Sequence, residues 1–88
     1  MSERQVRVGS KVGLHARPAS LFAKAVANSG VAVQIAKPGG TPVNARSVLN
    51  LLTLGVEYGE SVTLTAEGEG AEAALDELAA MLERELDG

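Results

Sequence analysis

The chain has 88 residues, which suits one small domain, and we expect this domain to span residues 1–88. Hydrophobic residues make up 45% of the sequence and cysteine is absent, which excludes a disulfide framework and a thiolate metal site. A net charge of −3 and only two aromatic residues, Phe22 and Tyr58, argue against a nucleic-acid-binding surface.

A strand and a helix are predicted first along the chain. Residues 4–8 alternate so that Val6 and Val8 share one face of a strand. Apolar side chains then recur at helical spacing over residues 16–28, and Gly30 follows as an end signal.

A β-hairpin is predicted next. Residues 31–35 alternate between apolar and polar side chains, and residues 37–40 form a Pro-Gly turn that leads back through residues 41–45. Because Pro42 has no amide hydrogen to donate to a neighbouring strand, this third strand should lie at a sheet edge.

The second half of the chain predicts a helix, a strand and a final helix. Ser47 opens a short helix that Gly55 closes, and residues 62–66 alternate as a fourth strand. Residues 68–70 form a turn before the last helix, whose apolar face contains Ala71, Ala74, Leu75, Leu78, Leu82 and Leu86. The order βαββαβα indicates an α+β domain in which helices cover one face of a sheet.

The single histidine, His15, lies in the run GLHARPAS at residues 13–20. Pro18 suits the first turn of a helix, so His15 should lie at the helix N-terminus, where unpaired amides and the helix dipole favour an anion. A neutral imidazole beside such a site, with an arginine two residues further on, predicts a residue that carries phosphate. On these residues alone, His15 is either a phosphate carrier, with Arg17 donating hydrogen bonds to the phosphoryl oxygens, or an ordinary cap or surface residue at the helix start.

No nucleotide site is predicted anywhere in the sequence. The chain has no Walker-type loop, and the Gly-x-Gly turn at residues 68–70 carries Glu69 with Glu72 close behind, which would repel a phosphate. We therefore expect no cofactor and no metal. The phosphoryl group should come from a protein partner. The chain is predicted to be a stoichiometric carrier and not an independent enzyme.

The short helix after Ser47 has too many apolar residues for one face. Five of its seven positions are apolar: Val48, Leu49, Leu51, Leu52 and Leu54. A two-turn helix on a small domain buries about half of such residues, so the others should form a binding surface. Full burial of the helix is the alternative.

A stripe on the first helix should complete this binding surface. Its residues recur at helical spacing and place basic side chains at the rim: Arg17, Ser20, Leu21 and Lys24. Residues 1–47 hold seven of the eight basic residues of the chain, so an acidic partner is expected.

Two stretches together resemble one known family. The run GLHARPA at residues 13–19 resembles the active-site signature of the HPr family, the histidine-containing phosphocarriers of the bacterial phosphoenolpyruvate:sugar phosphotransferase system. The stretch NARSVL at residues 44–49, with Leu54-Gly55 after it, resembles the serine-site signature of that family. The length of the chain and the order of its predicted elements also agree with this family, so the resemblance covers essentially the whole chain. The resemblance implies an open-faced β-sandwich with a four-stranded antiparallel sheet and three helices on one side.

The resemblance also implies roles and partners. His15 would accept a phosphoryl group from enzyme I, originally from phosphoenolpyruvate, and pass it to sugar-specific IIA domains during sugar uptake. Ser47 would cap its helix and be a regulatory phosphorylation site for a serine kinase, while Leu51 and Leu54 would face inward. The partner-binding residues would be Ser20, Leu21, Lys24, Val48, Leu49 and Leu52.

Two alternatives share much of this pattern. One is a regulatory adaptor on the same scaffold, which binds a transcription regulator and carries no phosphate on histidine. Relatives of that kind lack the histidine, so His15 and Arg17 argue against it. The other is a carrier in a nitrogen-linked phosphotransfer chain, whose motifs overlap with those of the sugar carriers. The sequence leaves open this choice, the sugar and the IIA acceptor.

A cytoplasmic location is expected. Residues 1–5 are polar and charged, unlike a secretory signal peptide, and no apolar run approaches the ~20 residues that span a bilayer. We expect no membrane insertion. A monomer would suit a carrier that exposes one face to successive partners.

Overall fold

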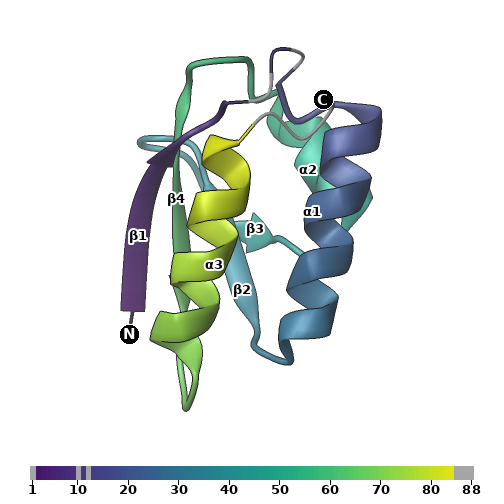
Figure 1. The fold of residues 1–88 in the computed structure, drawn as a ribbon. Helices are drawn as coiled ribbons and strands as arrows, with labels where there is room; N and C mark the ends of the chain where they lie inside the picture. The colour runs from purple at the N-terminus through teal and green to yellow at the C-terminus, as the bar shows by residue number, and fades with distance from the viewer. Residues whose placement is uncertain (1, 10, 12, 85–88) are drawn as a thin grey trace.

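A four-stranded antiparallel sheet forms one layer of the computed structural model, and three helices cover one of its faces (Figure 1). The structure describes residues 2–9, 11 and 13–84. The elements in chain order are β1 (Ser2–Arg7), α1 (Ala16–Ser29), β2 (Val33–Ala36), β3 (Val43–Asn44), α2 (Val48–Leu54), β4 (Ser61–Ala66) and α3 (Ala71–Glu83). This architecture and the order βαββαβα confirm the fold predicted from the sequence.

The strands lie in the order β1-β4-β2-β3, and each neighbouring pair is antiparallel. Val6 of β1 lies opposite Val62 of β4, and Ile35 lies opposite Leu64 between the two central strands. β3 pairs with β2 alone, which confirms that the strand after Pro42 lies at an edge.

Two strands, β2 and β3, are shorter than predicted. β2 begins at Val33, because the amide of Val31 donates to the hydroxyl of Ser29 at 3.2 Å instead of joining the sheet. β3 is limited to Val43 and Asn44, and the side chain of Asn44 accepts a hydrogen bond from the amide of Arg46 at 2.9 Å just after the strand. Such local side-chain bonds compete with a strand ladder.

The ends of the first two helices follow their sequence signals. Gly30 ends α1 with φ 72°, a left-handed conformation that glycine adopts without steric cost. Ser47 caps α2, since its hydroxyl accepts a hydrogen bond from the amide of Asn50 at 3.2 Å. Gly55 closes α2, and its amide donates to the carbonyl of Leu52 at 3.2 Å. The predicted cap at Ser47 is therefore confirmed.

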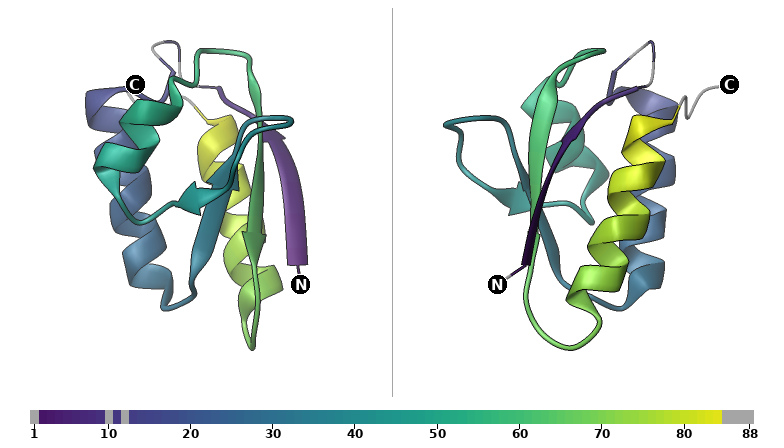
Figure 2. Two further views of the ribbon diagram at one scale, coloured as in Figure 1. Left: turned by 180° about the vertical axis from the view of Figure 1, so that it is seen from behind. Right: turned by 60° about the vertical axis from the view of Figure 1, so that its left-hand side comes forward.

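The core lies between the sheet and the helices, two layers that the right-hand view of Figure 2 shows. The alternating residues of β4 point into it, and Phe22 is the largest fully buried side chain. The predicted apolar face of α3 is buried at Ala71, Ala74, Leu75, Leu78 and Leu82. Leu86, predicted on the same face, lies outside the described residues.

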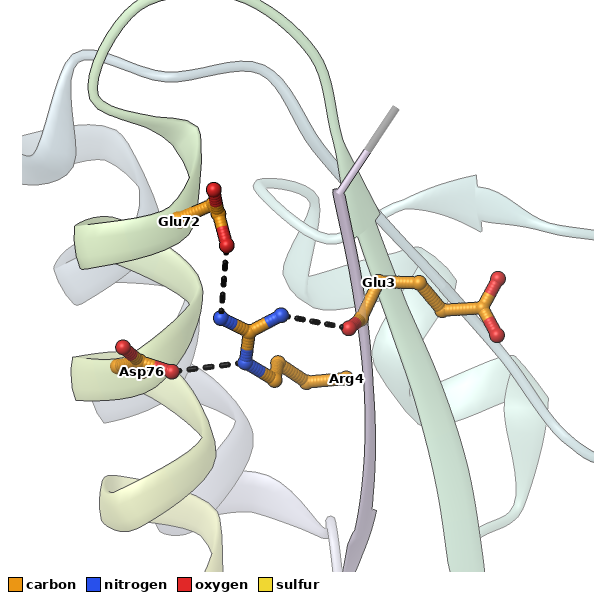
Figure 3. Close-up of polar contacts among 4 residues, drawn as sticks. All are labelled: Glu3, Arg4, Glu72 and Asp76. Atoms are coloured by element: carbon orange, nitrogen blue, oxygen red, sulfur yellow. Dashed lines mark hydrogen bonds and ion pairs between the residues drawn. The ribbon is translucent and has the colours of Figure 1, made fainter.

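Arg4 ties the edge strand β1 to α3 (Figure 3). Its Nε donates to Asp76 at 2.7 Å, its Nη2 contacts Glu72 at 3.4 Å, and its Nη1 donates to the carbonyl of Glu3 at 2.8 Å. The hydrogen bond to Asp76 raises the pKa of Arg4 above its ordinary value. The guanidinium thus lies between strand and helix and holds them together on the surface.

No helix in the described part of the chain is long and apolar enough to cross a membrane.

Candidate functional site

His15 is the N-cap residue of α1, as predicted. Its backbone is extended, with φ −100° and ψ −170°, and its carbonyl accepts a hydrogen bond from the amide of Ala19 at 2.8 Å. Its side chain makes no capping hydrogen bond and is 50% exposed. The imidazole is therefore accessible to another protein.

The segment before His15 is held against the loop that follows α2. Leu14 is fully buried, and its amide donates to the carbonyl of Val56 at 2.9 Å. Gly13 has φ 71°, and a Cβ atom there would lie 2.3 Å from the carbonyl oxygen of Val56. Only glycine permits both this conformation and this close approach.

We expect Gly13→Ala to lower the free energy of unfolding by about 3 kcal/mol, because it adds a backbone collision to the cost of a left-handed conformation. Gly39→Ala is the matched control, since Gly39 has φ 75° but nothing within 4 Å of its Cβ position. The control should lose only about 1 kcal/mol. Urea denaturation of both variants measures this difference. Equal losses would show that the approach to Val56 is unimportant.

The first turn of α1 presents donors to an anion. The amides of Ala16 and Arg17 are the first two of the helix and have no carbonyl acceptor within it, while Pro18 has no amide hydrogen. This turn contains no acidic residue, and the Arg17 side chain is exposed. Two amides and the positive end of the helix dipole therefore lie at the N-terminus that His15 caps, and Arg17 belongs to the same first turn.

Glu57 also belongs to this site, and the sequence reasoning missed it. Its Oε1 lies 3.5 Å from Nε2 of His15, and its side chain is 66% exposed. Glu57 follows the short helix and is far from His15 along the chain, so no local spacing signals their contact. The tertiary bond between Leu14 and Val56 brings the two segments together.

The turn that carries Glu57 is held at both ends. The Glu57 amide donates to the Glu60 carboxylate at 2.8 Å, and the Glu60 amide donates to the Glu57 carbonyl at 3.1 Å. The Glu57 amide holds the pKa of Glu60 below its ordinary value, and Lys37 lowers it further. Lys37 contacts the carbonyl of Gly55 at 3.3 Å and the Glu60 carboxylate at 3.5 Å.

α2 lies beside the N-terminal half of α1 (Figures 1 and 2), and its exposed large side chains are apolar. Leu49 is 69% exposed and Leu52 is 39% exposed, which confirms the prediction that this helix is not fully buried. Leu51 is fully buried and Leu54 packs partly against the core, as the resemblance implied.

The exposed residues of the two helices form a surface that we call the α1–α2 face. It comprises the predicted stripe and the apolar side of the short helix: Arg17, Ser20, Leu21, Lys24, Val48, Leu49 and Leu52. All seven side chains are exposed, with cations on the α1 part and aliphatic groups on the α2 part. Such a surface suits a protein partner with an apolar centre and acidic groups around it.

A hollow between two helices lies away from this site. It has a volume of about 700 Å³ between α1 and α3, and Ala25, Ala74, Leu78 and Met81 contribute to its walls. His15, Arg17 and Ser47 do not line it. Within the described ranges, no group of three or more His, Cys, Asp or Glu side chains could hold a metal ion.

A family model, a related sequence and a solved structure all point to the same family. A family model described as the PTS HPr component phosphorylation site matches residues 2–84. The phosphocarrier protein HPr of Streptomyces coelicolor is 54% identical over 82 residues, which cover 93% of this chain and 88% of that protein. The crystal structure of a phosphocarrier protein HPr from Bacillus anthracis matches with a TM-score of 0.86 at 38% identity. The match covers 92% of this chain and 95% of that chain.

A second kind of relative has a different name. The HPr-like protein Crh of Bacillus subtilis is 41% identical over 86 residues, which cover 98% of this chain and all of Crh. A crystal structure of Crh, a dimer, has a TM-score of 0.74 and covers 98% of both chains.

Proposed function

Because the chain belongs to the HPr family of phosphocarriers, we propose that it accepts a phosphoryl group on His15 and passes it on as a stoichiometric intermediate. The observation that carries this proposal is the half-exposed imidazole at the start of α1, beside Arg17 and two unpaired amides. These groups supply a nucleophile and an anion site in one place.

Each residue has a distinct part in the proposed transfer. A ring nitrogen of His15 attacks the phosphorus atom of a phosphorylated donor protein, and the bond between phosphorus and the donor nitrogen breaks. Arg17 and the first amides of α1 hold the phosphoryl oxygens, whose negative charge they partly neutralise. Onward transfer reverses these steps, with His15 as the leaving group.

The proposed donor is enzyme I, and the proposed acceptors are sugar-specific IIA domains. Both would dock on the α1–α2 face, since it lies at the same end of α1 as His15. We also propose a cytoplasmic monomer, because successive partners must reach the same face. Sedimentation velocity tests this oligomeric state directly, and a stable dimer like that of Crh would contradict it.

Transfer from phosphoenolpyruvate through purified enzyme I tests the proposed function. The expected product carries one phosphoryl group per chain, which is labile in acid and stable in base, as expected for phosphohistidine. No label on His15 would contradict the carrier and favour the regulatory adaptor. Faster labelling by an enzyme I of a nitrogen-linked chain would identify that branch instead.

We propose that Ser47 is a regulatory phosphorylation site in addition to its role as a cap. We expect Ser47→Asp to keep or raise the melting temperature, because an anion is favourable at the N-terminus of α2. The same charge next to the apolar side chains of Val48 and Leu49 should sharply slow the phosphorylation of His15 by enzyme I. Thermal denaturation and the transfer assay measure the two effects.

Ser47→Ala separates the cap from the charge. It should lower the free energy of unfolding by about 1 kcal/mol through loss of the bond to Asn50, and leave the transfer rate unchanged. Unimpaired transfer in Ser47→Asp would leave Ser47 as a cap alone.

A further inference from the structure

We infer that Glu57 is a positioning residue, whose carboxylate orients the His15 imidazole for phosphoryl transfer. This inference rests on the proposed function. Its basis is the 3.5 Å contact between Glu57 Oε1 and His15 Nε2, which joins the loop after α2 to the N-terminus of α1. In proteins, the hydrogen bond made by one imidazole nitrogen decides which of the two carries the proton.

The contact leaves the second ring nitrogen as the nucleophile. A carboxylate facing Nε2 favours the tautomer with the proton on that nitrogen, so the lone pair is on Nδ1. A gap of 3.5 Å shortens to a hydrogen bond with a shift of a few tenths of an ångström, as contacts at reacting sites do when a partner closes over them.

The charge of Glu57 also matches the charge that transfer creates. The Nδ1 lone pair forms the bond to phosphorus, while the bond between phosphorus and the donor nitrogen breaks and returns its electron pair to the donor. The His15 ring keeps its Nε2 proton and becomes positively charged. The carboxylate faces this charge, as the aspartate of a catalytic triad faces its imidazolium.

The loop is built to hold Glu57 in place. The backbone amide and the backbone carbonyl of Glu57 both form hydrogen bonds with Glu60. Lys37 in turn contacts the Glu60 carboxylate and the carbonyl of Gly55. The Leu14–Val56 bond then joins this loop to the residue before His15. Since these contacts use the backbone of Glu57, its side chain is left to face the imidazole.

Removal of the carboxylate should change the imidazole without unfolding the chain, because the Glu57 side chain is largely exposed. In ¹⁵N NMR spectra of the unphosphorylated protein, we expect one neutral tautomer of His15 in the wild type and a mixture of tautomers in Glu57→Ala. In the transfer assay, kcat should fall about three- to fivefold in Glu57→Ala, the size expected for an exposed charge pair. The KM for the carrier should stay unchanged, because Glu57 acts on the imidazole and not on docking. A residue that contributes to docking would raise KM instead.

Two further variants control this experiment. Glu57→Gln keeps an oxygen that can accept from Nε2–H, so it should restore the single tautomer and part of kcat. Glu69→Ala removes the same charge from the turn before α3, at the opposite end of the sheet from His15, and should change nothing (Figure 1).

Either an unchanged tautomer ratio or an unchanged kcat in Glu57→Ala overturns the role of Glu57, as does an equal effect of Glu69→Ala. The NMR measurement needs no phosphate donor. A wild-type chain that enzyme I does not label would therefore contradict the proposed function, while the tautomer comparison would still test the contact between Glu57 and His15.

Discussion

His15→Ala should accept no phosphoryl group from enzyme I and phosphoenolpyruvate under conditions that label the wild type stoichiometrically. The substitution removes the only imidazole of the chain, and hydroxyl and carboxylate groups do not form the acid-labile, base-stable bond of a phosphohistidine. Intact-protein mass spectrometry, with and without brief acid treatment, measures both the stoichiometry and the lability of the label.

The fold should survive this substitution. The His15 side chain is half exposed and does not cap α1, so the helix keeps its backbone bond from Ala19 to residue 15. An unchanged urea midpoint for His15→Ala would show that labelling is lost because the acceptor residue is missing and not because the chain unfolds. Stoichiometric label that persists in this variant would exclude His15 as the carrier residue.

Leu49→Glu should weaken binding to enzyme I by about 2 kcal/mol or more, which is about a 30-fold rise in Kd. Leu49 is 69% exposed, the most exposed large aliphatic side chain of the described residues, and lies on the α1–α2 face. A carboxylate there would lose its hydration against an apolar partner surface. It would also repel the acidic groups with which the partner is expected to contact Arg17 and Lys24. Isothermal titration calorimetry at a fixed salt concentration measures the change.

Ala73→Glu is the control for added charge. Ala73 is exposed on α3, away from the α1–α2 face, so the same carboxylate should leave Kd near the wild-type value. Both variants should unfold at nearly the wild-type urea concentration, since both side chains are exposed. Wild-type affinity in Leu49→Glu, or an equal loss in Ala73→Glu, would show that α2 does not form the docking surface.

The sequence by itself determined those features that depend on neighbouring residues. Alternation, helical spacing, turns and caps predicted the seven elements, since all of these signals lie between residues close together in the chain. The ends of α1 and α2 were predicted at Gly30, Ser47 and Gly55, because caps act over a few residues. The position of His15 at the start of α1 followed from Pro18 and the apolar spacing after it.

The exposed side of α2 was predicted from geometry alone. Five apolar residues in seven positions exceed what one face of a short helix buries, and Val48, Leu49 and Leu52 are the ones that remain exposed. The start of β2 was predicted too early, because a side-chain bond of Ser29 takes the amide of Val31 away from the sheet, and β3 is limited to Val43 and Asn44.

Only the tertiary structure decided which distant residues meet. Glu57 faces His15 because Leu14 pairs with Val56 across the fold, and Arg4 reaches Asp76 because α3 packs on β1. Such contacts depend on the packing of whole elements, so no spacing within one element encodes them. The sequence therefore predicted His15 as the residue that carries phosphate, while the fold determined which carboxylate lies beside it.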